Sequence, residues 1–537
     1  MPRSRIFSKI LSLCGRNQGL IFALLLAIPI PLALRAQAPS GEISSTSRSV
    51  DQKQGTGTVP AGVKLASQMP AAASTKPFHF PAAAKRTLPN GLRTFVISDN
   101  EQPTVAIRLV LSSAGSINDP AGKTGTANIT ADMLTQGTAS RTAEQIAQAI
   151  DFVGGSLSTS ADDDATYISV TVVKKDFGLA MDLLSDILLR PAFKSEELDR
   201  RRQQALSNLQ LQYADPGYIA DAVLARLVYG KHPYGLPGSG TPDSLQKIDR
   251  ADLVSFRSRY YVPGNALLAF AGDVQPAEAF AAAEKFLGEG AWAKGETDSA
   301  VPPSPSPVRG THILLIDKAD ANQTQIRVGC LGIPRNSPDY LPLYVTNRIF
   351  GGGFNSRLST EVRQKKGLTY GAYSRFNSNR LAGDFSASTF TRTEATVEAT
   401  KLMVGLIGKM STGELGPHEL DFARDYISGV FPIQSETSEQ VASRVLTVVQ
   451  YGLPEDYNDT YQQKVLGVNP ADVKSMAGRY FNASDLILVL VGNAKDFRDA
   501  LRKEFPDAKF DELSFAQVDL LAPDLRKSKQ PTVPAGR

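Results

Sequence analysis

Histidine is the commonest metal ligand and a frequent general base, and this chain has only four. They are His79, His232, His312 and His418, and no two of them lie within one helical turn of each other. A catalytic zinc site usually takes three protein ligands, commonly with two histidines on one helix face. The chain offers no such pair, so a histidine zinc site is not expected. His232, in Y-G-K-H-P-Y-G, is expected to be a loop residue with local hydrogen bonds.

Other catalytic groups are equally scarce. Cys330 is the one cysteine after the first 38 residues, so no internal disulfide can form there, and it lies in an apolar stretch. The G-x-S-x-G motif of serine hydrolases is missing from the sequence. The run F-G-G-G-F-N-S-R at 350–357 lacks the Gly-Lys-Ser/Thr of a phosphate loop. Its composition alone predicts a flexible loop.

The first 38 residues predict a secretory signal peptide. They hold five basic and no acidic residues, an apolar run at 19–34, and the sequence A-Q-A at 36–38 as a cleavage site. The apolar run is short for a membrane span, although an uncleaved anchor is the open alternative. We therefore expect a periplasmic or otherwise exported protein that is free of the membrane after cleavage. Residues 39–77, rich in Ser, Thr, Gly, Ala and Pro, are expected to be a flexible spacer.

Charge gives no reason to expect a nucleic-acid partner. The whole chain has a net charge of +4, but residues after 38 carry 53 basic and 54 acidic side chains. A near-neutral mature chain lacks the positive surface that binds nucleic acid or anionic membranes.

The chain divides into two similar halves. The run V-P-P-S-P-S-P-V at 301–308 cannot continue a helix or a central strand, so we place a linker at 296–309. It separates one domain at 78–295 from another at 310–520, followed by a tail at 521–537. The 24-residue segments that start at Ala251 and Ala471 align without a gap, with an offset of 220. Each segment predicts a helix end, a turn and a buried strand, so an internal duplication is expected.

Strands and helices alternate within each half, which predicts an α+β fold with helices over mainly antiparallel sheets. In the first half the expected elements are strands at 104–112 and 167–173 and helices from Thr142 to 154, at 177–189 and from Ser195. In the second half they are a strand at 324–331, helices at 340–350 and 356–366, and strands from 370 to 389.

Several motifs, in order, resemble those of the pitrilysin-like (insulinase) metallopeptidase family over residues 78–520. They are L-P-N-G-L at 88–92, A-G-S-I-N-D-P-A-G-K-T-G at 114–125, G-T-A-N-I-T-A-D-M-L-T-Q-G-T at 125–138, P-A-F-K-S-E-E-L-D-R-R-R at 191–202, and N-R-I-F-G-G-G-F-N-S-R-L-S-T-E-V-R-Q-K-K-G-L-T-Y at 347–370. The resemblance implies two homologous α/β-sandwich half-domains that form a clam-shell.

The resemblance also implies that the zinc motif is lost. In active members H-x-x-E-H supplies two zinc ligands and the base that activates water. Asn128 and Asp132 stand at the two ligand positions and Ala131 at the base. The third ligand, a downstream Glu, would fall at Ser207 or Asn208, and neither is a carboxylate. We therefore expect no cofactor in this chain.

The second half keeps more of the family pattern. Arg363 and Tyr370 match, in type and spacing, an Arg/Tyr pair that faces the zinc across the substrate cleft in the family. The phenol would stabilise the oxyanion of peptide hydrolysis, and the guanidinium would bind substrate carbonyls. We expect a helix at 356–366 closed by Gly367, with Tyr370 starting the next strand. The loop Gly351, Gly352, Gly353 and Phe354 is expected to face substrate, or to be a simple turn.

Three functions fit these expectations. The first is the non-zinc subunit of a heterodimeric exported zinc metallopeptidase, with peptide substrates and with zinc in a homologous partner that carries H-x-x-E-H. The second is a non-catalytic scaffold or peptide-binding paralogue. The third, an uncommon metal site that uses Asp132, has the least support from the sequence.

Overall fold

The computed structural model describes residues 77–295 and 301–527, so the expected signal peptide and nearly all of the spacer lie outside the described residues. The N-terminal half contains strands β1 Ala84–Thr87, β2 Arg93–Ser98, β3 Thr104–Ser112, β4 Ser156–Ala161, β5 Ala165–Val173 and β6 Ala266–Gly272. Its helices are α1 Thr126–Met133, α2 Ala143–Phe152, α3 Phe177–Leu189, α4 Ser195–Ala214, α5 Pro216–Tyr229, α6 Pro242–Lys247, α7 Arg250–Tyr260 and α8 Pro276–Leu287.

The C-terminal half follows the extended segment 301–311. Its strands are β7 His312–Asp317, β8 Gln323–Leu331, β9 Ala372–Ser378, β10 Gly383–Arg392, β11 Ile487–Gly492 and β12 Lys509–Ser514. Its helices are α9 Tyr340–Phe350, a π-helix at Ser359–Lys365, α10 Thr396–Met410, α11 Glu419–Ile433, α12 Ser438–Gln450, α13 Tyr457–Leu466, α14 Pro470–Tyr480 and α15 Arg498–Glu504. No helix among the described residues is both long and apolar enough to cross a membrane.

Each half builds one mainly antiparallel sheet, so the expected α+β class is confirmed. The strand orders are β1-β2-β6-β3-β5-β4 and β12-β7-β11-β8-β10-β9. The last five strands of the first order correspond one by one to the last five of the second. In both sheets the first two of these five are parallel, β2 with β6 and β7 with β11. The sixth strand differs, because β1 precedes β2 and runs antiparallel to it, whereas β12 ends the second half and runs parallel to β7.

Local sequence sets several boundaries as expected. Thr142 and Gln145 form a reciprocal capping box at the start of α2. Asn469 and Asp472 cap α14 in the same way, and α14 lies 220 residues after α7. The duplicated segment therefore folds as helix, turn and buried strand in both halves.

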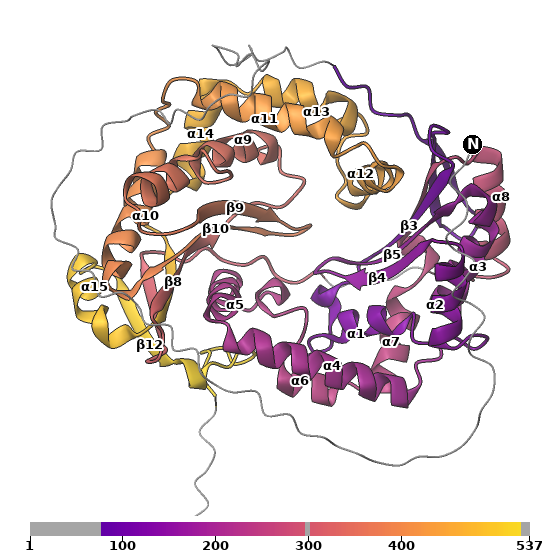
Figure 1. Cartoon of the computed structure of the whole chain (residues 1–537), viewed down its shortest axis with the longest axis horizontal. Helices are drawn as coiled ribbons and strands as arrows, with labels where there is room; N and C mark the ends of the chain where they lie inside the picture. The colour runs from indigo at the N-terminus through magenta and orange to yellow at the C-terminus, as the bar shows by residue number, and fades with distance from the viewer. Residues whose placement is uncertain (1–76, 296–300, 528–537) are drawn as a thin grey trace, which may run out of the picture. The chain divides into compact units, whose positions relative to one another are not determined.

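The two faces of each sheet are covered by helices of different origin. One face of the first sheet packs on helices of its own half, through residues such as Phe270, Leu268 and Ile107. Its other face, with Phe95, Ile97 and Leu267, packs on α12 of the C-terminal half. In return, α5 of the N-terminal half covers β8 and β11 (Figure 1).

This exchange explains why β6 and β11 lack polar residues. All seven residues of β6 and all six of β11 are buried, because both faces of each strand meet a helix. Such strands are continuous apolar runs without a period of two. The segment from 521, which we expected to be a tail, still packs at Leu525, which lies buried in the cluster around α5.

A polar contact also joins the halves, at the β4–β5 and β9–β10 turns. The Asp163 carboxylate accepts a hydrogen bond from Asn379 Nδ2 at 2.9 Å, and Asp164 accepts one from the Arg380 backbone N–H at 2.8 Å. The Tyr234 hydroxyl donates to the same Asp164 side chain. These bonds fix the β9–β10 turn against the first half.

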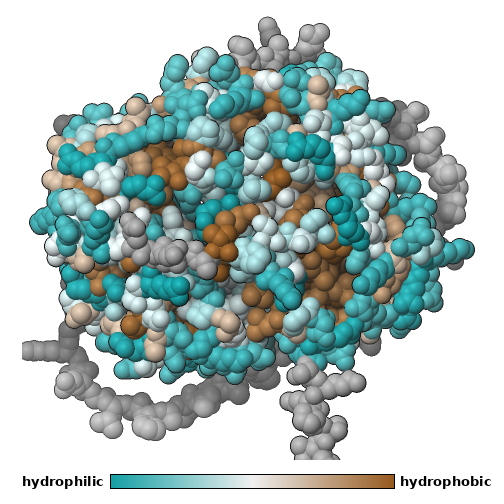
Figure 2. Space-filling model, turned by 180° about the vertical axis from the view of Figure 1, so that it is seen from behind, coloured by the Kyte–Doolittle hydropathy of each residue, from teal (hydrophilic) through white to brown (hydrophobic). Residues whose placement is uncertain are grey.

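The surface is mixed in character. Figure 2 shows one face, on which apolar patches interrupt a mainly hydrophilic surface. Among large apolar side chains, Phe422, Tyr426 and Ile433 of α11 are exposed, as are Phe354 and Tyr370 in loops. Single exposed apolar residues are common, so only those that also line a pocket are informative about a site.

Candidate active-site corner and degenerate zinc position

Arg363 lies on the helix that was expected at 356–366, and the turn Ser359–Lys365 of this helix is π-helical. The backbone N–H of Lys366 donates to Glu361 and that of Leu368 to Val362, which widens this turn. Val362 is fully buried and anchors the turn in the core. π-Helical turns are rare and occur often at functional sites. The wider turn sets the direction in which the half-buried Arg363 leaves the helix.

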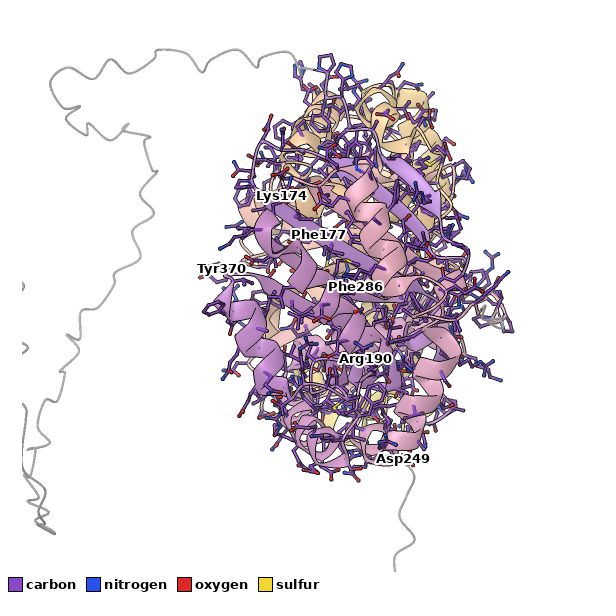
Figure 3. All side chains as sticks on the ribbon, turned by 90° about the vertical axis from the view of Figure 1, so that its right-hand side faces the viewer. Lys174, Phe177, Arg190, Asp249, Phe286 and Tyr370 are labelled. Carbon is purple, nitrogen blue, oxygen red and sulfur yellow. The ribbon has the colours of Figure 1, made fainter. Side chains whose placement is uncertain are left out.

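Tyr370 precedes its strand by two residues, so the prediction that it starts the strand is wrong. β9 begins at Ala372, and Tyr370 lies in the loop after the π-helix with 82% of its surface exposed. Figure 3 shows Tyr370 at the margin of the molecule. A phenol in this position is open to a ligand.

Arg363 and Tyr370 line one pocket of about 450 Å³, together with Gln323, Leu368 and Arg392 among others. The loop that carries Tyr370 is tied to β10 by threonine hydroxyls: Thr391 Oγ1 donates to the Leu368 carbonyl at 2.7 Å and Thr389 Oγ1 to that of Gly371 at 2.9 Å. The structure therefore places the two predicted residues in one pocket, and hydrogen bonds to β10 hold the loop that carries Tyr370.

Two further residues of this pocket escaped the sequence analysis. Gln323 begins β8 and Arg392 ends β10, and their Cα atoms are partners in the sheet register. The sequence separates them by 69 positions, so only the pairing of the two strands brings them together. Nothing in the local pattern marks either residue.

The glycine loop has a packing reason for its composition. A Cβ on Gly351 would lie 2.2 Å from Ser374 Oγ and 2.7 Å from the Ser374 backbone nitrogen. A Cβ on Gly353 would meet the guanidinium of Arg348, which donates to the Gly352 carbonyl. Close approach to β9 and to Arg348 is therefore what excludes larger residues here.

Phe354, at the end of that loop, is 57% exposed and touches the candidate site directly. Its ring centre lies 4.6 Å from Cζ of Arg363, which is a cation–π contact. Of the four loop residues proposed to bind substrate, Phe354 is the one whose side chain contacts the Arg/Tyr pair.

The positions of the family's zinc ligands do not fit a zinc ion. Asn128 Nδ2 donates to the Gly238 carbonyl at 2.8 Å, so its amide is engaged with the backbone. Ala131 is fully buried in the core, and Asp132 is exposed. On α4, Ser207 Oγ donates to Gln203 and Asn208 is exposed. Across residues 77–295 and 301–527 no three His, Cys, Asp or Glu side chains form a group that could hold a metal ion.

The helix start itself is stabilised by a residue that sequence reasoning overlooked. Asp119 accepts hydrogen bonds from the backbone N–H groups of Gly125, at 2.7 Å, and Ala127, at 2.8 Å. A carboxylate at a helix N-terminus satisfies unpaired donors. Burial nevertheless raises the pKa of Asp119 to about 7. The helix has thus kept a structural cap while its metal ligands are gone.

His232 and Cys330 have structural environments. His232 is buried, and its Nδ1 accepts a hydrogen bond from the Tyr234 backbone N–H, as the expected local loop contact requires. Burial lowers the pKa of His232. Burial also raises the pKa of the Cys330 thiol to about 12, which disfavours the nucleophilic thiolate.

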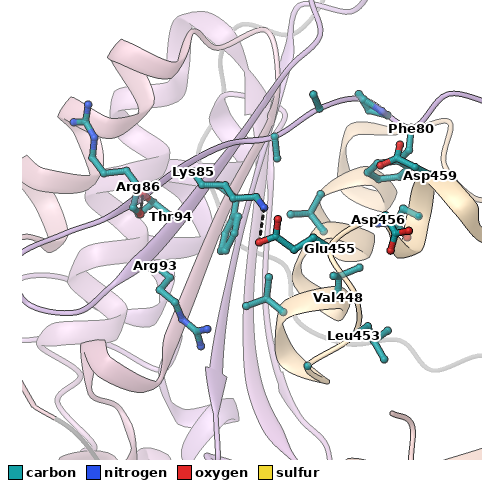
Figure 4. Close-up of a pocket in the computed structure, with 18 of the residues that line it drawn as sticks. Phe80, Lys85, Arg86, Arg93, Thr94, Val448, Leu453, Glu455, Asp456 and Asp459 are labelled. Atoms are coloured by element: carbon teal, nitrogen blue, oxygen red, sulfur yellow. Dashed lines mark hydrogen bonds and ion pairs between the residues drawn. The ribbon is translucent and has the colours of Figure 1, made fainter. Parts of the chain in front are cut away.

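A second pocket, of about 750 Å³, lies between β1 and the α12–α13 region. Lys85 on β1 forms an ion pair with Glu455 across it, at 3.2 Å (Figure 4). Both side chains are largely exposed, so this pair contributes little stability. Lys85, Arg86 and Arg93 line one side of this pocket and acidic residues line the other. Neither Arg363 nor Tyr370 lines it.

Comparison with known proteins places both halves in one family. The model of the insulinase family, peptidase family M16, matches residues 93–241, and that of the peptidase M16 inactive domain matches residues 247–427.

Individual relatives are similar to this chain over most of its length. An uncharacterized zinc protease of Mycobacterium leprae is 28% identical over 74% of this chain and 89% of its own length. A non-peptidase homolog of Helicobacter pylori is 24% identical over 73% of this chain and 90% of its own length. The solved structure of a peptidase M16 inactive domain from Pseudomonas fluorescens is 27% identical, with a TM-score of 0.72 over 76% of this chain and 98% of that one.

The matched models, the duplicated sheets and the ordered motifs agree, and they cover both halves. This chain belongs to the insulinase family of peptidases, peptidase family M16, as a member that lacks the zinc motif.

Proposed function

We propose that this chain is the non-zinc subunit of an exported two-chain zinc metallopeptidase, to which it contributes Arg363 and Tyr370. The observation that carries the proposal is the contrast between the two halves. Arg363 and Tyr370 line one open pocket, whereas the ligand positions on α1 hold an engaged amide and a lone carboxylate. A chain that had lost the whole function would have no need to keep the pair together.

The roles of the two side chains follow from their chemistry. Peptide hydrolysis develops a negative oxygen, and a phenol hydroxyl directed at it is worth about 3–4 kcal/mol, as one oxyanion-hole donor is. A guanidinium provides a planar pair of donors for substrate carbonyls or carboxylates. Tyr370 is exposed enough to reach a substrate held by another chain, and Phe354 restrains Arg363 from behind.

Zinc and its base would come from a homologous partner with an intact H-x-x-E-H. This chain would hold no cofactor of its own, because its ligand positions do not fit the metal. Export is proposed from the predicted signal peptide alone. An adjacent reading frame that encodes such a partner would support the proposal at once.

A peptide-binding role without catalysis is the second candidate. It is favoured by one observation, the likeness to a Helicobacter pylori protein named as a non-peptidase homolog. Under this alternative the same pocket binds peptides, but no partner gains activity. A metal site based on Asp132 has no support, since no group of metal-ligating side chains surrounds it among the described residues.

The test is reconstitution. The purified chain is mixed with a partner that carries H-x-x-E-H, and cleavage of a quenched fluorescent peptide library is measured for each chain alone and for the mixture. We expect cleavage only from the mixture, and loss of that cleavage when Arg363→Ala and Tyr370→Phe are combined. The proposal would be contradicted, in favour of the second candidate, if cleavage were equal with and without this chain. Equal cleavage by mixtures with the natural chain and with the double variant would contradict it as well.

A further inference from the structure

The pocket beside Tyr370 contains more positive charge than the Arg/Tyr pair requires. Arg363 and Arg392 both line it, with Gln323, Phe390 and Tyr370, and no carboxylate is among its lining residues. Among the described residues neither arginine forms an ion pair with an acidic side chain. Two arginines therefore line one space of about 450 Å³, and no carboxylate lines it with them.

The acidic side chains of neighbouring elements do not supply that charge, because they pair with other cations. Glu361 pairs with Lys365 at 2.7 Å and Glu398 with Lys366 at 3.1 Å. Glu419 holds Arg357 at 2.5 Å. Glu394, two residues after Arg392, does not line the pocket. The local carboxylates thus leave the pocket as a positive site.

The walls of the pocket fix the groups that a ligand would meet. The register of β8 and β10 places Arg392 opposite Gln323, where β8 begins and β10 ends. Thr391 Oγ1 holds the Leu368 carbonyl, which fixes the loop that carries Tyr370. Cζ of Arg363 lies over the ring of Phe354, at 4.6 Å from its centre, so the ring limits where that guanidinium can move.

We propose that this pocket binds a carboxylate of the peptide substrate, either an acidic side chain or the C-terminal carboxylate. A planar guanidinium matches a carboxylate with two parallel hydrogen bonds, and the phenol of Tyr370 and the amide of Gln323 add donors. Phe390 supplies an apolar wall for the carbon atoms of the residue. The inference rests on the proposed function and narrows its substrate class to peptides with a negative charge near the scissile bond.

Peptide binding to the purified full chain, without any partner, tests the proposal by fluorescence anisotropy. Three short labelled peptides of Ala, Ser and Leu are compared: one amidated and free of carboxylates, one with a free C-terminus, and one amidated with a central Glu. We expect one carboxylate peptide to bind about tenfold tighter than the neutral peptide, since a charged hydrogen-bonded pair gives that much. The tighter of the two identifies the source of the carboxylate.

Variants assign the effect to the pocket. Arg392→Gln should remove the tenfold preference, and Arg392→Lys should keep part of it because the charge remains. Arg309→Gln is the control, because it makes the same change of charge at a distant position. Arg309 lies shortly before His312, and His312 is at the opposite end of the sheet from Gln323. Equal binding of all three peptides, no binding of the carboxylate peptides, or an unchanged preference in Arg392→Gln would each overturn the proposal.

The outcome is separable from that of the proposed function. If the chain prefers carboxylate peptides but activates no zinc partner, the carboxylate pocket is supported and the subunit role is contradicted. If the reconstituted pair cleaves peptides but the chain shows no such preference, the subunit role is supported and the carboxylate pocket is contradicted.

Discussion

The Cζ atom of Arg363 lies 4.6 Å from the ring centre of Phe354. This contact links the glycine loop after α9 to the π-helix that carries the arginine. Both residues are open to ligands, because Phe354 is exposed and Arg363 half-buried. The ring therefore positions the guanidinium at the rim of the pocket.

Phe354→Leu should weaken peptide binding by the isolated chain about two- to fivefold, because an exposed cation–π contact is worth about 0.5–1 kcal/mol. Phe354→Tyr keeps the ring and should bind like the natural chain. Titration of a labelled peptide measures both. If the Leu and Tyr variants bind alike, the ring has no part in positioning Arg363.

Tyr370→Phe should lower the turnover of the reconstituted pair about 100- to 1,000-fold and change peptide affinity little, as expected for a donor used in the transition state. The control is Tyr344→Phe, which removes a phenol from α9 outside the pocket. Turnover and KM are measured for both. A loss confined to KM would assign Tyr370 to substrate binding, and unchanged kinetics would assign it to packing.

Gly351→Ala should destabilise the protein by about 1–3 kcal/mol, the usual range for forcing atoms into a packed site. The added Cβ would overlap Ser374 at 2.2 Å. Gly405→Ala on α10 is the matched control: among the described residues no atom beyond its chain neighbours and the backbone of its own helix lies within 4 Å of its Cβ position. We therefore expect a gain of about 0.5–1 kcal/mol from helix propensity. Urea unfolding compares the two. A stable Gly351→Ala chain with weaker peptide binding would show that this glycine serves substrate contact.

Asp163→Asn should make stability less dependent on pH. Burial raises the pKa of Asp163 to about 6, and the groups that face it are Ser116, Asn379, Asp162, Asp164, Asp119 and Tyr229. Because this pKa is above the usual 3.8, the stability of the protonated form is complete below about pH 4 and is lost as pH rises through 6.

The Asn variant stays neutral, so at pH 7.5 we expect it to exceed the natural chain in stability by up to about 3 kcal/mol. At pH 4 the two should agree, since Asn379 and the Ser116 hydroxyl can still bond the amide. Unfolding midpoints at both values measure this. A variant that is equally destabilised at both pH values would show that the carboxylate is ionised and needed.

Local signals predicted most elements because the capping residues and periods that specify them are local. The helices at 177–189 and 340–350 and the strand at 104–112 lie where the sequence indicates. The 220-residue offset correctly predicted the duplicated helix and strand. These features depend on neighbours within a few residues.

Other features depend on contacts that the sequence does not encode locally. The exchange of α5 and α12 between the sheets is one, since an amphipathic helix does not specify which sheet it covers. The π-turn at Arg363 is another, because a Ser-Thr-Glu-Val-Arg-Gln-Lys segment has ordinary α-helical propensity. Arg392 joined the pocket only through the register of β8 and β10.

The central claim is that this chain holds no catalytic zinc and completes a zinc site supplied by another chain. Metal analysis of the purified chain alone, of the H-x-x-E-H partner and of their complex, with peptide cleavage measured on the same samples, tests it most directly. We expect no stoichiometric zinc and no cleavage for this chain alone, and one zinc per pair with cleavage in the complex. Stoichiometric zinc and peptide cleavage in this chain alone would contradict the claim.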